Sequence, residues 1–184
     1  MPVFIANVFG KVELAPYLYN VSKPLVNMQT TTLTPDVELV EKALATLATI
    51  DFSMLKLKLQ DREEGLGWSA DQCAIAECDY RRFLALKCAY PDEEIVPNQA
   101  VDKFWHFHIL DTQAYARDCQ QVFGYFVHHF PYFGMRGEQD LRDLHVAFAD
   151  TTALFALHFG EGYDNAKSGG RGKCRTACKP VKCK

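Results

Sequence analysis

The chain has 184 residues, of which 48% are hydrophobic, 23% charged and 12% aromatic. This composition is typical of a globular protein, and one domain of this length buries roughly 70% of its unfolded surface without needing disulfides. The formal net charge of −3 conceals two opposite parts. Residues 1–166 hold 13 basic against all 23 acidic residues, a net charge of −10, whereas residues 167–184 carry seven basic residues and no acidic one.

The beginning of the chain and its cysteines indicate a compartment. No basic residue precedes Lys11, so the start does not match a secretory signal, and no run approaches the roughly 18 to 20 apolar residues that cross a bilayer. We therefore expect a cytoplasmic protein without a membrane partner. In a reducing cytosol an odd number of cysteines argues against a complete disulfide framework, so four are expected to be buried thiols: Cys73, Cys78, Cys88 and Cys119.

The apolar residues of the N-terminal part follow no sustained helical or strand period, and we expect an irregular arm over residues 1–33. A helix is predicted over roughly 35–50, where Thr34 can cap the N-terminus and Pro35 suits the first helical position. Its apolar residues recur at helical spacing: Val37, Val40, Ala43, Leu44, Leu47 and Ile50. Residues 51–68 are expected to form a short helical piece and a turn.

Two helices are predicted in the middle of the chain. Ser69 and Gln72 form the pattern of a capping box, which starts a helix that runs to about Cys88. Its apolar stripe consists of Cys73, Ala76, Tyr80, Phe83, Leu84 and Cys88. After Pro97, a further helix opens at Asn98 and continues to Leu110.

The remaining elements are helical as well. A fourth helix is expected from a cap at Asp111 or Thr112 to Gly124, which is a good C-terminal stop, and a last helix over residues 138–159. No repeat, heptad or alternation of strand and helix is apparent. We therefore predict a mainly α protein, with a compact bundle-like helical domain over residues 34–164.

Four of the six histidines lie between residues 106 and 129, close to several acidic residues. On a helix with about 100° per residue, Asp102 and His106 share a face, whereas His106 and His108 point in opposing directions. A site that uses both His106 and His108 would require the helix to end or distort near residue 108.

A transition-metal site is the leading interpretation of this cluster. Imidazole binds zinc, iron or copper, a carboxylate can bind directly or orient a ring, and a thiolate favours zinc or copper(I). The spacing makes four residues the natural candidates for metal ligands: Asp102, His106, Cys119 and His129. The pattern lacks the His-Glu-x-x-His pair of metalloproteases.

Two other interpretations stay open. Cys119 could act as a nucleophile with His106 or His129 as its base, but the sequence identifies no oxyanion hole. Alternatively, the histidines form a buried hydrogen-bond network with carboxylates such as Asp102, and Cys119 is a small buried side chain. The protein would then be a non-catalytic interaction module.

Several short motifs between residues 70 and 134 form a distinctive series. They are Tyr80-Arg-Arg-Phe-Leu-Ala-Leu, Ile95-Val-Pro, Val101-Asp-Lys-Phe-Trp-His-Phe-His-Ile-Leu, Tyr115-Ala-Arg-Asp-Cys119, Phe123-Gly124 and His129-Phe-Pro-Tyr-Phe-Gly134. This series resembles the glycine-rich domain-containing protein-like family. The resemblance implies a polar functional site without defining a reaction. It also implies that seven residues of this chain occupy the motif positions of the family: Asp102, Trp105, His106, His108, Tyr115, Cys119 and His129.

These observations predict a polar pocket around residues 98–130 that binds zinc or iron and supports an enzymatic step of unknown type. The candidate catalytic residues are Cys119 and Tyr115, the latter as a proton donor. The candidate metal ligands are Asp102, His106, His108, Cys119 and His129.

Residues 165–184 form a basic segment that is rich in glycine and contains Cys174, Cys178 and Cys183. Three thiolates are one short of a tetrahedral zinc set, so this segment could bind zinc or copper(I) with a fourth ligand from the helical domain. Its charges could instead contact nucleic-acid phosphates, another anionic partner or the acidic domain, although it has no aromatic residue to stack on bases. A solvated segment without a partner is the remaining interpretation.

Overall fold

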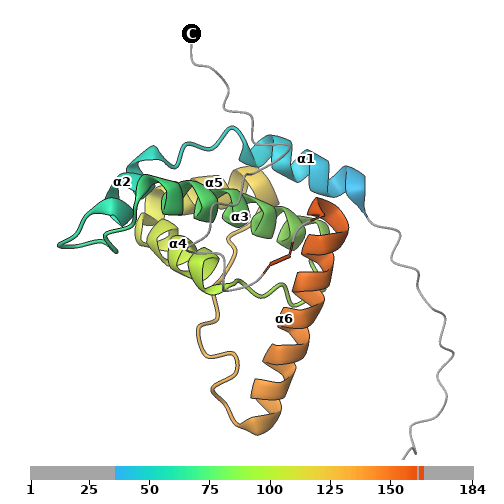
Figure 1. Cartoon of the computed structure of the whole chain (residues 1–184). Helices are drawn as coiled ribbons and strands as arrows, with labels where there is room; N and C mark the ends of the chain where they lie inside the picture. Colours follow the sequence, from blue (N-terminus) through green and yellow to red (C-terminus); the bar gives the residue numbers. More distant parts are fainter. Residues whose placement is uncertain (1–35, 161, 164–184) are drawn as a thin grey trace, which may run out of the picture. The chain divides into compact units, whose positions relative to one another are not determined.

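The structure is a computed structural model that describes residues 36–160, 162 and 163. In this range the chain forms six helices and no strand (Figure 1), which confirms the predicted mainly α class. None of these helices is long and apolar enough to cross a lipid bilayer. The expected arm at residues 1–33 and the basic segment at residues 165–184 lie outside the described residues.

Helix α1 (Val37–Leu47) begins later and ends earlier than the sequence predicts. Asp36 caps it, because its carboxylate accepts a hydrogen bond from the Leu39 N–H at 3.3 Å. The predicted cap, Thr34, lies outside the described residues. After Leu47 the chain turns, and the Arg81 guanidinium donates to the main-chain oxygens of Leu47 and Ile50. Helix α2 (Ser53–Gln60) follows this turn.

Helix α3 (Ala70–Ala89) is the central element and contacts α1, α2 and α4 (Gln99–Leu110). The predicted capping box is confirmed, because Ser69 accepts from the Gln72 N–H and the Gln72 side chain accepts from the Ser69 N–H. Residues 82–86 are all buried. Five consecutive buried residues cover more than a full turn, so this part of α3 is enclosed on every side. Figure 1 shows it between α1 and α4.

Helices α4 and α5 (Thr112–Phe123) form a hairpin in which a single residue, Asp111, separates them. Asp111 caps α5 by accepting from the Ala114 N–H at 3.1 Å, and α5 ends at Gly124, whose φ of 76° lies in the left-handed region. Both features were predicted. Helix α4 stays helical through Leu110, so His106 and His108 keep their different directions.

Helix α6 (Glu138–Phe159) joins the other helices through its second half, where its buried residues lie. The Thr151 hydroxyl accepts from the Val96 N–H at 2.9 Å. Beyond the helix, the ring of Tyr163 stacks on Phe155 at 3.7 Å, and its hydroxyl accepts from the Asn98 N–H at 2.8 Å. These contacts bring the end of the described chain to the N-terminus of α4, which Asn98 caps.

Candidate metal centre

Three of the predicted ligands come together on the surface beside α4. Nε2 of His129 lies 2.9 Å from Oδ1 of Asp102, and Nε2 of His106 lies 3.7 Å from the same oxygen. The three possible ligand atoms all lie within 4.8 Å of one another. Two imidazole nitrogens therefore converge on one carboxylate oxygen.

Helix periodicity and ring packing position this triad. Asp102 and His106 are four residues apart on α4, so they share a face one turn apart. His129 comes from the connection between α5 and α6, and its ring packs edge-on against Trp105 at 4.5 Å. The side chain of His129 is 13% exposed, that of Asp102 34% and that of His106 48%. One side of the triad is thus open to solvent.

Tyr115 holds the segment that carries His129. Its hydroxyl donates to the main-chain oxygen of Val127 at 2.5 Å and accepts from Nε1 of Trp105 at 2.9 Å. Burial raises the pKa of Tyr115 far above its usual value, so the phenol keeps the proton that it donates. The hydroxyl of this catalytic candidate is thus bonded to the protein on two sides.

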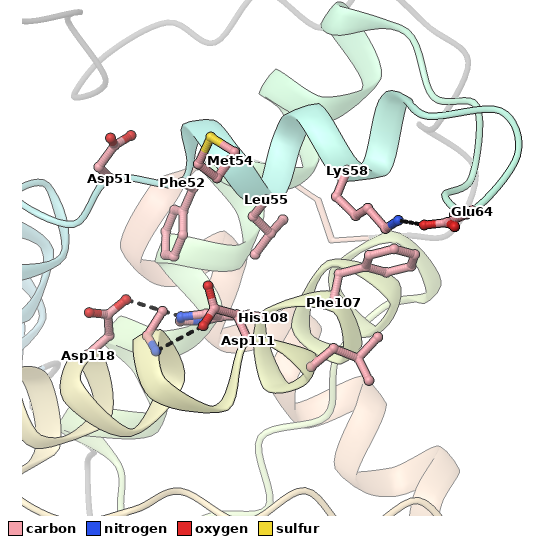
Figure 2. A pocket seen from close by; sticks show the side chains of 12 residues that line it. Asp51, Phe52, Met54, Leu55, Lys58, Glu64, Phe107, His108, Asp111 and Asp118 are labelled. Atoms are coloured by element: carbon pink, nitrogen blue, oxygen red, sulfur yellow. Dashed lines mark hydrogen bonds and ion pairs between the residues drawn. The ribbon is translucent and has the colours of Figure 1, made fainter.

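His108 lies in a separate, buried network. Its Nδ1 is 2.9 Å from the Tyr80 hydroxyl. Its Nε2 is 3.1 Å from Oδ2 of Asp118 (Figure 2). Burial lowers the pKa of His108, while the nearby negative charge of Asp118 opposes this effect. A neutral ring that accepts from Tyr80 and donates to Asp118 satisfies both nitrogens, so neither is directed at the triad.

The His108 network borders a pocket of about 360 Å³ between α2, the end of α4 and the start of α5 (Figure 2). Phe52, Leu55 and Phe107 supply apolar walls, and His108 and Asp118 contribute polar groups. The residues that line this pocket do not include those of the triad. The His108 network and the triad are therefore two separate polar clusters, both of which include residues of α4.

Cys119, proposed from the sequence as a ligand or nucleophile, is buried on α5. Burial raises the pKa of its thiol, although the Val127 backbone and the Tyr115 side chain oppose this effect. A neutral thiol is a weak nucleophile and a weak metal ligand. Among the described residues, Cys119 lies with Tyr115 and is not one of the groups that converge on Asp102. The other candidate cysteines, Cys174, Cys178 and Cys183, lie outside the described residues.

Sequence reasoning gave Tyr80 and Asp118 no role at the site. A signal for Asp118 exists, because it lies three residues after Tyr115 and one before Cys119, on the apolar face of an amphipathic helix. An acidic residue on a buried face requires a partner. Which residue supplies it depends on the packing of α5 against α4, and this packing is not visible in one sequence.

A family model described as UCP032817-like matches residues 32–149. The match covers well over half of the chain and includes the whole triad, so the protein belongs to the UCP032817-like family, which is uncharacterised. No curated protein and no solved structure matches the chain.

The predicted membership of the glycine-rich domain-containing protein-like family is therefore wrong. The motif that suggested it is short, and burial and hydrogen bonding account for several of its positions. Trp105, His108 and Tyr115 are buried and bonded to neighbouring side chains. These residue types therefore have a structural explanation within this fold.

Proposed function

We propose that this protein binds one divalent transition-metal ion, zinc or iron, through Asp102, His106 and His129. The convergence of two imidazole nitrogens on one carboxylate oxygen supports this function. A bound cation would replace the hydrogen-bonding protons between these groups. Two histidines and one carboxylate are the donor set of mononuclear non-haem iron sites and of some catalytic zinc sites.

The spacing of the three groups is compatible with coordination. Metal–ligand distances of about 2.0–2.2 Å place neighbouring ligand atoms about 3–4 Å apart. The two distances to Asp102, 2.9 and 3.7 Å, already fall in this range. The widest pair, within 4.8 Å, requires a movement of about 1 Å to reach the range of a bound site. The exposed ring of His106 has room for this movement.

Three protein ligands leave coordination positions for water or a substrate. In catalytic metal sites an open position allows the cation to polarise a bound group or to lower the pKa of a bound water. The solvent-exposed side of the triad is compatible with such access. An enzymatic step supported by this protein would therefore take place at the metal, with Tyr115 and Trp105 positioning His129.

Metal analysis of the untagged protein tests this function. We expect about one equivalent of metal after loading, together with a rise in the thermal unfolding temperature, because a ligand specific to the native state stabilises it. Asp102→Asn and His129→Ala should both lose the metal. His128→Ala is the matched control, since His128 is exposed and adjacent to His129. Less than about a tenth of an equivalent, with no stabilisation by zinc, iron or cobalt, would contradict the proposal.

A second candidate function, non-catalytic protein interaction, is supported by exposed apolar side chains close to the triad in sequence. Five residues between α5 and α6 are each 45% or more exposed: Tyr125, Phe126, Phe130, Tyr132 and Met135. Large apolar residues gathered on a surface are typical of interaction sites. In this case the bond between His129 and Asp102 would be purely structural. A metal-free protein whose unfolding does not respond to added metal would favour this function over the first.

A further inference from the structure

We propose that the pocket between α2, the end of α4 and the start of α5 binds a small organic amine, whose ammonium group lies beside the carboxylates of Asp111 and Asp118. The pocket has a volume of about 360 Å³, and its lining residues do not include those of the triad. Cavities of this size with apolar walls and a few polar groups are typical of small-molecule sites. The inference therefore goes beyond the proposed metal site and does not depend on it.

The apolar part of the pocket would hold the carbon skeleton of the ligand. Phe52, directly before α2, and Leu55 on α2 line it together with Phe107 on α4 (Figure 2). Met54 and Leu110 also line the pocket, although they are 73% and 75% exposed. Covering such side chains removes apolar surface from water, which favours binding. The walls thus suit a ligand with an aliphatic or aromatic part.

A buried network forms the polar end of the pocket. The side chains of His108 and Asp118 are 4% and 6% exposed, and Nε2 of His108 lies 3.1 Å from Oδ2 of Asp118. Oδ1 of Asp118 accepts from Nε of Arg117 at 3.1 Å. An ionised carboxylate has about four acceptor positions, so it can accept a further hydrogen bond from a ligand. An ammonium group in the pocket would therefore find a buried acceptor at Asp118.

A second carboxylate lies at the same end. Asp111 precedes α5, and Asp118 follows seven residues later, two turns along the same face. Burial lowers the pKa of His108, and the negative charges of Asp118 and Asp111 both oppose this effect, so both carboxylates act on one ring. The cation of Arg117 is 68% exposed, and water and salt screen its charge. Two carboxylates therefore face this end of the pocket against one screened cation.

The other charged groups that line the pocket already have opposite charges beside them. The ammonium group of Lys58 bonds to Glu64 (Figure 2). Asp51 lies close to two cations, those of Lys56 and Arg81. An additional positive charge is therefore best accommodated at the polar end, between the two carboxylates of α5.

A metal ion fits this pocket less well than an organic cation. Among the described residues, the triad is the only group of three or more potential ligands whose atoms lie close enough to hold one ion. The pocket instead combines separate carboxylates with apolar walls, which supply no metal ligands. A primary amine matches both features, because its ammonium group has three donors and its carbon atoms cover the walls.

Calorimetric titration of the full-length protein at low ionic strength tests the proposal. Three probes share a phenyl ring and a two-carbon chain but differ in charge: 2-phenylethylamine, 2-phenylethanol and 3-phenylpropanoate. We expect the amine to bind at least about tenfold more tightly than the alcohol, because its hydrogen bonds to carboxylates are charge-assisted. The negatively charged probe should not bind. Added salt should weaken binding of the amine.

Two pairs of variants locate the ligand. Asp111→Asn removes one charge while asparagine still caps α5, so the affinity for the amine should fall about three- to tenfold. Asp143→Asn, at an exposed carboxylate of α6, should leave it unchanged. Ala114→Leu fills the pocket with a larger side chain and should abolish binding. Ala116→Leu places the same side chain at an exposed position of α5 and is its matched control.

Several results would overturn the inference. They are equal affinities for the amine and the alcohol, preference for the carboxylate probe, and binding of the amine that Ala114→Leu leaves unchanged. No binding of the amine up to about 10 mM, a weak limit even for so small a ligand, would also refute it. The proposed metal site is tested separately, since Asp102→Asn should bind the amine as the wild type does. Loss of amine binding in Asp102→Asn would place the amine at the triad instead of the pocket.

Discussion

The hydroxyl of Tyr115 donates to the main-chain oxygen of Val127 at 2.5 Å and ties α5 to the irregular segment that carries His129. The same hydroxyl accepts from Trp105, whose ring packs against His129. The buried Tyr115 hydroxyl therefore bonds both to the backbone two residues before His129 and to the Trp105 ring that packs against His129. Tyr115 itself is not one of the three groups that converge at Asp102.

Tyr115→Phe should weaken both the fold and the metal site. The change leaves the Trp105 N–H and the Val127 carbonyl without this partner, and a buried unsatisfied group costs about 1–3 kcal/mol in the free energy of unfolding. Because residues that orient a ligand tune metal affinity, we expect zinc to bind about 10- to 100-fold more weakly. Urea unfolding and zinc titration measure the two effects.

Tyr125→Phe is the control for this substitution, because Tyr125 is 53% exposed. It should change the free energy of unfolding by no more than about 0.5 kcal/mol. Zinc affinity that is equal in Tyr115→Phe and in the wild type would show that the position of His129 does not depend on this hydroxyl.

The free energy of unfolding should depend on pH through His108 and His158. Burial lowers the pKa of both rings below the ordinary value of 6.5, against the charges of Asp118 near His108 and Asp36 near His158. Between the lowered pKa and 6.5, the unfolded chain binds more protons than the folded chain, so stability rises with pH in this window. The contribution is fully present above about pH 7 and is lost as the pH falls through this window.

Urea unfolding at a series of pH values measures this dependence. His108→Gln should reduce the slope, because glutamine has no proton to gain in the unfolded chain. His145→Gln should leave the slope unchanged, since His145 is exposed. An identical slope in His108→Gln and in the wild type would exclude His108 as a source of the effect.

Local interactions explain which features were predictable from the sequence. The capping box of Ser69 and Gln72 and the stop at Gly124 depend on residues a few positions apart, so their residue types are sufficient to predict them. Asp102 and His106 share a face for the same reason, since the period of α4 brings them together.

The features that could not be predicted depend on contacts between distant segments. His129 was a candidate ligand by residue type, but its place beside Asp102 depends on an irregular connection without helical periodicity, which the Tyr115 hydrogen bond to Val127 ties to α5. Likewise, His108 meets Tyr80 on α3, 28 residues earlier, and this pairing follows from the packing of α3 against α4. One sequence without relatives contains no signal for such pairs.

Arg81→Lys should destabilise the junction of α1 and α3, although it keeps the charge. The guanidinium donates to the carbonyls of Leu47 and Ile50 and to Glu77, and it lies over the ring of Phe52 at 4.5 Å. An ammonium group cannot reproduce this planar set of donors. We expect a loss of about 2–3 kcal/mol in the free energy of unfolding, measured with urea.

Arg142→Lys provides the comparison for Arg81→Lys. The Arg142 side chain is 61% exposed and donates to Gln139, so its replacement should have an effect within about 0.5 kcal/mol. Equal stabilities of the two variants would show that the bonds of Arg81 to the end of α1 contribute nothing to the fold.

Thr151→Val tests how α6 is attached to the other helices. The hydroxyl of Thr151 is fully buried, accepts from the Val96 N–H at 2.9 Å and donates to the Ala147 carbonyl at 2.8 Å. Valine has nearly the same shape but cannot accept, so the buried N–H of Val96 would lose this partner. The expected loss in the free energy of unfolding is about 1–3 kcal/mol.

Two further variants separate hydrogen bonding from packing at this position. Thr151→Ser keeps the hydroxyl and loses one methyl group, so it should cost less than Thr151→Val if the bond to Val96 dominates. Thr46→Val removes a hydroxyl that donates only within α1, to the Lys42 carbonyl, and should change the free energy of unfolding by no more than about 0.5 kcal/mol. If Thr151→Ser were the more damaging change, packing of the methyl group would anchor α6, because the serine variant still supplies the acceptor for Val96.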